Sequence, residues 1–159
     1  MTLEERTVEA LKRKKLVMAC AESCTGGLIA KRITDVSGSS AVFNCGIVSY
    51  SNEIKEKLLG VREETLRKFG AVSEQTVREM VSGVMSASGA DVAVAVSGIA
   101  GPLSDNTDKP VGLIYIAVSD GNETRVKQLN NKFDKDIRES NRKSASDEAL
   151  KMLLEIVGD

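Results

Sequence analysis

The sequence predicts an α/β fold, a three-layer α/β/α sandwich around a mixed, mostly parallel sheet. Short, continuous apolar runs at residues 16–21 (LVMACA) and 91–96 (DVAVAV) are typical of strands buried on both faces. Segments with helical apolar spacing alternate with these strands. A strong turn signal at 120–122 (DGN) separates two further strand-like segments and predicts an antiparallel hairpin, which makes the sheet mixed.

The first part of the chain alternates helices and strands. A capping-box pattern, T-x-x-E, predicts an amphipathic helix over residues 3–14, before the strand at 16–21. Two glycines then lead into residues 28–33 (LIAKRI), whose apolar spacing is helical rather than alternating. Residues 41–50 (AVFNCGIVSY) are expected to form the next strand.

The middle of the chain carries two cap signals. Asn52 can begin one helix, and Ser73 can begin another whose apolar stripe ends near Gly89. The strand at 91–96 follows and runs into a glycine-bearing loop. A loop in this place is where open α/β sheets bind ligands, because ligand sites lie outside the carboxyl ends of the strands.

The last third predicts the hairpin and a closing helix. Residues 111–119 and 124–129 flank the turn signal and have strand character. Residues 136–157 carry apolar side chains at helical spacing and predict one long helix that completes the sandwich.

Composition restricts the class of protein. The 159 residues, 42% of them hydrophobic, predict a single domain over 1–159 with a full core. No apolar run suits a membrane span or a signal peptide, so we expect a cytoplasmic protein. A net charge of -1 with only three Phe and two Tyr argues against a nucleic-acid surface and favours a small-molecule substrate. The sequence leaves homo-oligomerisation open.

The cysteines predict neither a disulfide framework nor a metal site. Cys20, Cys24 and Cys45 are odd in number and form no CxxC pair. We therefore expect reduced thiols and chemistry without a metal or another cofactor.

Two candidate nucleophiles, Ser23 and Cys24, stand side by side in the segment 19–27 (ACAESCTGG). The chain has no histidine, so either would need a lysine, a tyrosinate or a carboxylate as its base. The thiol of Cys24, assisted by Lys55 and Glu22, is a chemically reasonable nucleophile for amide hydrolysis. Either residue could instead be non-catalytic, with Ser23 only capping a helix and Cys24 only packing in the core. Because neighbours on a strand face opposite sides, we expect one of the two to face a pocket.

Lys55 is the candidate base, and Tyr50 lies near it at the same junction between strand and helix. A lysine can accept a proton only when neutral, which requires an enclosed pocket. The surrounding EIKEK pattern is equally typical of a solvated helix face. At the start of the preceding helix, the amides of Thr25, Gly26 and Gly27 could stabilise an oxyanion.

Two further elements could bind a phosphate. The loop at 97–102 (SGIAGP) could do so through its amides, although so short an element could also be only a turn. Arg138 and Arg142 are one helical turn apart and could bind a phosphate or a carboxylate, although such pairs are commonly surface residues. The chain lacks the GxxxxGK[ST] spacing of a nucleotide-hydrolysing P-loop.

Five spaced motifs together resemble the CinA carboxy-terminal domain family. In chain order they are AESCTGG at 21–27, SYSNE with Lys55 at 49–55, GAVS at 70–73, SGIAGP at 97–102 and KPVG at 109–112. The resemblance covers nearly the whole chain. It implies a stand-alone nicotinamide mononucleotide deamidase, which hydrolyses the pyridine carboxamide to give nicotinate mononucleotide and ammonia.

The resemblance also implies roles for individual residues. It assigns the nucleophile to Ser23 and its partners to Tyr50 and Lys55. Substrate and phosphate contacts are implied for Ser97, Gly98 and Arg138.

One segment departs from the family pattern. Family members commonly have a glycine-rich stretch before KPVG, whereas residues 103–108 (LSDNTD) contain no glycine. The alternative interpretation is therefore a non-catalytic pyridine-nucleotide-binding or regulatory domain in which the substrate-binding segment at 103–108 is altered.

Overall fold

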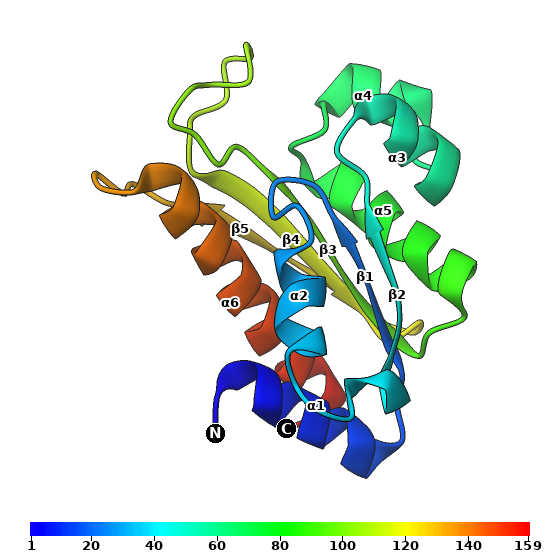
Figure 1. Cartoon of the computed structure of the whole chain (residues 1–159). Coiled ribbons are helices and arrows are strands. Elements are labelled where there is room, and N and C mark those ends of the chain that lie inside the picture. Colours follow the sequence, from blue (N-terminus) through cyan, green and yellow to red (C-terminus); the bar gives the residue numbers. More distant parts are fainter.

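The computed structural model describes residues 1–159 and contains a five-stranded sheet between two layers of helices (Figure 1). The elements are α1 (Leu3–Lys14), β1 (Met18–Glu22), α2 (Leu28–Thr34), the short 3-10 helix η1 (Ser39–Ala41), β2 (Phe43–Val48), α3 (Asn52–Leu59), α4 (Glu63–Phe69), α5 (Glu74–Ser88), β3 (Val92–Gly98), β4 (Leu113–Ser119), β5 (Thr124–Asn130) and α6 (Ile137–Val157). No helix combines the length and the apolar character that crossing a membrane would require.

The sheet has the strand order β2-β1-β3-β4-β5. β1 pairs in parallel with both β2 and β3, whereas β4 is antiparallel to β3 and to β5. Only β4 therefore runs against the others, which confirms the mixed, mostly parallel sheet. The carboxyl ends of β1, β2 and β3 consequently meet at one edge of the sheet.

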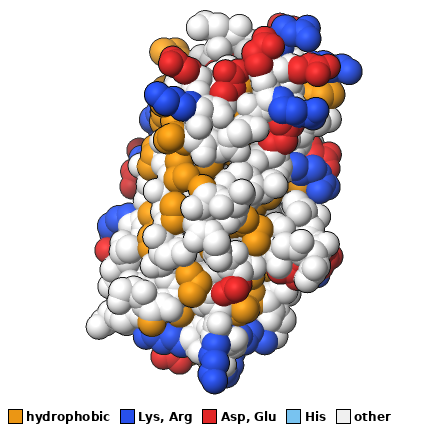
Figure 2. All heavy atoms as spheres, turned by 90° about the vertical axis from the view of Figure 1, so that its right-hand side faces the viewer, with side chains coloured by type: hydrophobic (Ala, Val, Ile, Leu, Met, Phe, Trp, Pro, Cys, Tyr) orange, Lys and Arg blue, Asp and Glu red, His pale blue; other side chains and the backbone are white.

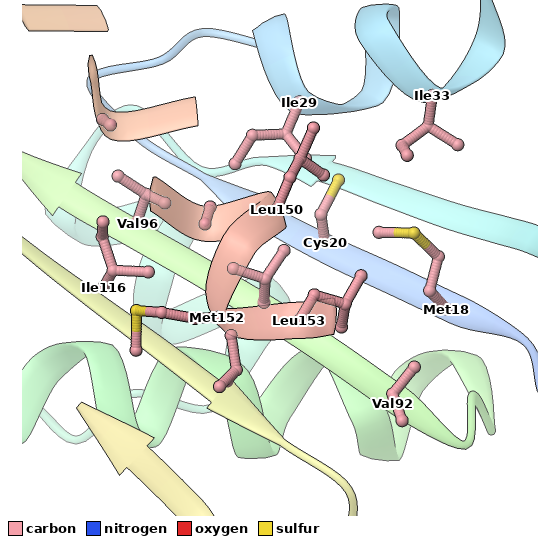
Figure 3. Close-up of a cluster of buried hydrophobic side chains, with 14 of the residues drawn as sticks. Met18, Cys20, Ile29, Ile33, Val92, Val96, Ile116, Leu150, Met152 and Leu153 are labelled. Atoms are coloured by element: carbon pink, nitrogen blue, oxygen red, sulfur yellow. The ribbon is translucent and has the colours of Figure 1, made fainter. Parts of the chain in front are cut away.

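The two faces of the sheet bury separate apolar clusters. Side chains of α1, α2 and α6 cover one face, where Met18 and Cys20 of β1 meet Leu150 and Leu153 of α6 (Figure 3). Helices α3, α4 and α5 cover the opposite face, which receives the alternate residues of β1. Both faces of β1 are thus buried, and this explains its continuous apolar sequence.

Most of the predicted helix starts are confirmed. The Thr2 and Glu5 capping box forms, and Ser73 accepts a hydrogen bond from the Thr76 amide at the start of α5. The cap of α3 is Ser51, one residue before the predicted Asn52, because its hydroxyl accepts from the Ile54 amide.

Helix α4 was not predicted from the sequence. It has seven residues, and its N-cap Arg62 makes no side-chain cap hydrogen bond. Leu66 is the buried apolar side chain that docks this helix on the α3 and α5 layer. One buried contact in so short a helix gives no periodic signal.

The surface seen from the side of α5 and β2 carries mixed charge (Figure 2). Basic and acidic side chains occur together toward the top, the bottom and the edges of this face, and hydrophobic and uncharged atoms fill most of its middle. This pattern agrees with the chain's near-neutral composition of 22 basic and 23 acidic residues.

Helices α3 and α5 cross so closely that we predict Gly83→Ala to be destabilising. A Cβ atom at Gly83 would lie 1.8 Å from the carbonyl oxygen of Leu59. Overpacking of this kind costs about 1–3 kcal/mol, although alanine is by itself the better helix former by about 1 kcal/mol. Urea unfolding should give a lower free energy of unfolding for this variant. Ser82→Ala, on the exposed face of the same helix, is the control; a variant at Gly83 as stable as this control would contradict the prediction.

Candidate active site

A pocket of about 500 Å³ lies where the carboxyl ends of β1 and β3 meet the start of α3. Its walls come from Ser23 and Cys24, from residues 71–72 before α5, and from residues 97–105, which comprise the end of β3 and the segment after it; Arg138 of α6 closes one side. The ligand-binding edge expected for an α/β sheet is therefore the edge that contains the pocket.

Ser23 is the first residue after β1 and is only 8% exposed. Its amide donates a hydrogen bond to the carbonyl oxygen of Val96, 3.0 Å away, which fixes it against β3. Its Oγ accepts a hydrogen bond from Nζ of Lys55 at 3.1 Å. The two candidate catalytic groups are thus in direct contact.

Lys55 points inward from α3 and is 1% exposed, so the alternative of a solvated face is wrong. Besides Ser23, its Nζ donates to the carbonyl oxygens of Ser49 at 2.8 Å and Tyr50 at 3.4 Å. No carboxylate forms an ion pair with it within the chain. Burial lowers the pKa of the amine from 10.5 to about 8, and the nearby Cys24 acts in the opposite direction. A substantial share of neutral lysine is available near pH 8.

Cys24 also borders the pocket, but it is only 6% exposed and belongs to the apolar cluster on the α1, α2 and α6 face, which is the core position considered for it above. Burial raises the pKa of the Cys24 thiol to about 12, and this disfavours the reactive thiolate.

Glu22 is directed away from Lys55 and toward α2. Its carboxylate accepts hydrogen bonds from the amides of Ile29 at 2.8 Å and Ala30 at 3.0 Å. It thereby caps a helix whose N-cap residue, Gly27, has no side chain for that purpose. The structure therefore does not bring Cys24, Lys55 and Glu22 together as one catalytic unit.

Residues 23–27, which we call the nucleophile loop, make the turn from β1 into α2. Gly26 and Gly27 have φ values of 59° and 101°, which side chains other than glycine rarely adopt. The Gly26 amide donates to the carbonyl oxygen of Ser23 at 3.0 Å, whereas the Thr25 and Gly27 amides have no partner within the chain. Two of the three predicted oxyanion donors are therefore unpaired, although none of residues 25–27 is among those that line the pocket.

Tyr50 lies at the mouth of the pocket and is 60% exposed. Its hydroxyl accepts a hydrogen bond from Nη2 of Arg138 at 2.9 Å. Nη1 of Arg138 donates to the carbonyl oxygen of Gly101, also at 2.9 Å. The structure thus brings Tyr50 and Arg138 together, while Tyr50 reaches Lys55 only through its backbone carbonyl.

Residues 97–102, which we call the substrate loop, begin at the end of β3. Ser97 and Gly98, for which the family resemblance implies substrate contacts, border the pocket. A Cβ at Gly98 would lie 2.7 Å from the side chain of Ile114, so the chain needs glycine there. Farther along the chain and outside the pocket lining, Nζ of Lys109 donates to the carbonyl oxygens of Phe69 at 2.6 Å and Val72 at 2.5 Å.

Several pocket residues were missed by the sequence reasoning, among them the polar residues Asn52 and Asp105. Asn52 was considered only as a helix cap, and its position two residues after Tyr50 was the available signal. Asp105 falls in the segment that departs from the family pattern, where no motif indicates which residues border the pocket.

Comparison with known proteins relates this geometry to a family. The chain is 55% identical over 137 residues to a protein of Enterobacter agglomerans named nicotinamide-nucleotide amidohydrolase PncC, covering 84% of this chain and 83% of that protein. It is 50% identical over 128 residues to a CinA-like protein of Kosmotoga olearia, covering 80% of this chain. The chain spans only 31% of the length of that relative, and the same share of a relative from Thermoanaerobacter.

Solved structures agree with the sequence matches. The crystal structure of the competence/damage inducible protein CihA from Agrobacterium tumefaciens has a TM-score of 0.92 and 40% sequence identity, covering 99% of this chain and 94% of that one. The family model named CinA C-terminal domain matches residues 1–157. These findings confirm the resemblance drawn from the five motifs, and the chain belongs to the CinA family.

Proposed function

We propose that this protein is a hydrolase of linear amides that converts nicotinamide mononucleotide to nicotinate mononucleotide and ammonia. One observation carries the proposal: a buried lysine amine with no carboxylate partner lies 3.1 Å from the hydroxyl of Ser23. A neutral amine in this place can take the serine proton. The name of the Enterobacter agglomerans relative supports the substrate.

The proposed reaction is acyl transfer to water. Neutral Lys55 accepts the proton of Ser23 while Oγ forms a bond to the carboxamide carbon. The resulting ammonium of Lys55 gives its proton to the leaving nitrogen, the bond from carbon to nitrogen breaks, and ammonia departs. Lys55, neutral again, deprotonates a water molecule that attacks the acyl-enzyme. The ester bond to Oγ then breaks, Oγ takes the proton back from Lys55, and the product acid leaves and loses its own proton to solvent.

The developing oxyanion needs hydrogen-bond donors near Ser23. The amides of Thr25 and Gly27 are the donors we propose, since both are without a partner within the chain. The Gly26 amide, predicted as a third donor, is already engaged with the carbonyl oxygen of Ser23. We therefore give it the role of shaping the turn.

The nucleotide phosphate fits the side of the pocket that holds Arg138. This guanidinium donates to neutral oxygens and forms no ion pair, so its charge is available to an anion. Ser97 and Gly98 also line the pocket and are proposed to contact the substrate. The cytoplasmic location, the single domain over 1–159 and any homo-oligomer stay predictions.

Replacement of the nucleophile should abolish turnover. We expect Ser23→Ala to lower the rate of ammonia release from nicotinamide mononucleotide by at least about 10³-fold, because no acyl-enzyme can form. Cys24→Ala, the adjacent control, should stay within a few-fold of wild type. Undiminished turnover in Ser23→Ala would remove this serine as the nucleophile, and wild-type binding without any ammonia release would favour the non-catalytic alternative.

The activity should depend on the protonation of Lys55. Because only the neutral amine is a base, kcat/KM should rise with pH to a midpoint of about 8 and fall about tenfold per unit below it. The unfolded chain, with its amine at about 10.5, binds this proton more tightly, so Lys55 also adds stability as the pH rises from about 8 to about 10.5. A pH profile of ammonia release, with unfolding measured over the same range, checks both effects.

Lys55→Met should lower kcat/KM about 10²–10⁴-fold, and the remaining activity should no longer show the pH dependence with a midpoint of about 8. Lys57→Met, on the exposed side of the same helix, is the matched control. A flat profile between pH 6.5 and 9.5 in the wild type would contradict the role of Lys55.

The variant Tyr50→Phe distinguishes two possible roles of the tyrosine hydroxyl, one in substrate binding and one in proton transfer. Since this hydroxyl contacts Arg138 and not Lys55, we expect KM to rise about tenfold and kcat to change less than about threefold. Steady-state kinetics at saturating and limiting substrate give the two constants. A fall in kcat with an unchanged KM would instead support a role for Tyr50 as a proton-transfer partner of Ser23, which the family resemblance implies.

A further inference from the structure

Three side chains on the first turns of α6 donate hydrogen bonds to the backbone of both pocket loops. Arg138, Asn141 and Arg142 are three and four residues apart, so they share one face of the helix. Arg138 and Asn141 reach the substrate loop, and Arg142 reaches the nucleophile loop. A single helix therefore contacts the turns that follow two different strands.

Arg142 holds the nucleophile loop through one carbonyl group. Its Nη2 donates to the carbonyl oxygen of Thr25 at 2.8 Å, and the same oxygen accepts from the Leu28 amide at 3.1 Å. A Cβ at Gly26 would come within 3.3 Å of this Nη2, so the guanidinium approaches a backbone that has no side chain in the way. Arg142 forms no ion pair with a carboxylate in the structure. Its contact with the loop is the polar contact that holds it.

Asn141 holds the substrate loop from inside the protein. It is 1% exposed, and its Nδ2 donates to the carbonyl oxygen of Ala100 at 2.9 Å. Its Oδ1 is buried and has no hydrogen-bond partner. A buried unpaired amide oxygen is unfavourable, and a leucine of similar volume would avoid it. The contact with Ala100 is the feature that an apolar side chain could not provide.

The rest of α6 is anchored to the sheet by buried apolar side chains, which holds the first turns of the helix in place. Ala145, Ala149, Leu150 and Leu153 are fully buried in the cluster against the sheet. Figure 3 shows Leu150 and Leu153 in this cluster. The loops themselves lie side by side, because the Ser23 amide bonds to Val96 of β3. A shift of either loop relative to the other would change the distance between the nucleophile and the bound amide.

We propose that Asn141 and Arg142 are positioning residues that fix the two loops on one helix, so that Ser23 meets a carboxamide held at a constant place. The proposal rests on the amide hydrolysis proposed above. Neither side chain touches the reacting atoms, and both act through backbone carbonyls. Displacements of about 1 Å in such an arrangement can reduce turnover about 10²-fold.

The test combines kinetics with hydrogen exchange on the full chain. Arg142→Met should lower kcat about tenfold or more and speed amide exchange in residues 23–30, where the Leu28 amide reports on the Thr25 carbonyl. Asn141→Leu should raise KM, lower kcat and speed exchange in residues 97–102. Exchange in residues 145–157 of α6 should stay at the wild-type rate, and Arg142→Lys, which keeps a donor, should recover part of kcat.

Lys143→Met, at the neighbouring exposed position of α6, is the matched control and should behave like the wild type. Folded variants with wild-type kinetics and wild-type exchange in both loops would overturn the proposal. So would faster exchange along the whole of α6, because that result indicates general destabilisation. If Arg142→Met does not fold, Arg142→Gln takes its place in both measurements.

The exchange measurement also separates this proposal from the proposed function. Absence of ammonia release by the wild type would reject the hydrolysis, while loop exchange in the variants still decides whether the helix fixes the loops. Ammonia release by the wild type with unchanged loop exchange in the variants would reject the positioning role alone.

Discussion

The burial of one amine, that of Lys55, is the constraint on which the site depends. A lysine with its charge removed from water is unstable as an ammonium, and this lowers its pKa to about 8. The carbonyl oxygens of Ser49 and Tyr50 satisfy two of its hydrogens without supplying a full negative charge, and the third direction is left to Ser23. The close crossing of α3 and α5 keeps the amine in this place, because α3 cannot move outward without losing its contact at Gly83.

The sheet topology explains why chemistry from distant parts of the chain meets here. Parallel pairing of β1 with β2 and β3 puts their carboxyl ends at one edge. The candidate nucleophile follows β1, the junction with Tyr50 and Lys55 follows β2, and Ser97 and Gly98 end β3. The antiparallel pair β4 and β5 completes the sheet on the other side and adds no group to the reacting centre. The polypeptide thus separates the strands that carry chemistry from those that provide only support.

How well a feature could be predicted depends on how far apart in the sequence the interacting residues lie. Strands and long helices could be predicted because their periodicity and caps are local, whereas α4 has too few buried residues to give a pattern. Ser23 and Lys55 could be proposed from residue type and family resemblance. The contact of Tyr50 with Arg138, and that of Arg142 with Thr25, could not, because these pairs are 88 and 117 residues apart in sequence. The inward direction of Lys55 likewise depends on how α3 docks, and the local EIKEK pattern does not determine it.

The capping of α2 by Glu22 fixes the length of the segment that carries Ser23. The carboxylate belongs to the last residue of β1, and its partners are the amides of Ile29 and Ala30, so the intervening chain is closed into a small ring. An inserted or deleted residue in this ring would break the cap or pull Ser23 out of line with Lys55. Change in this part of the molecule is therefore limited to substitution, whereas the cap sets no such limit on the length of segments outside the ring.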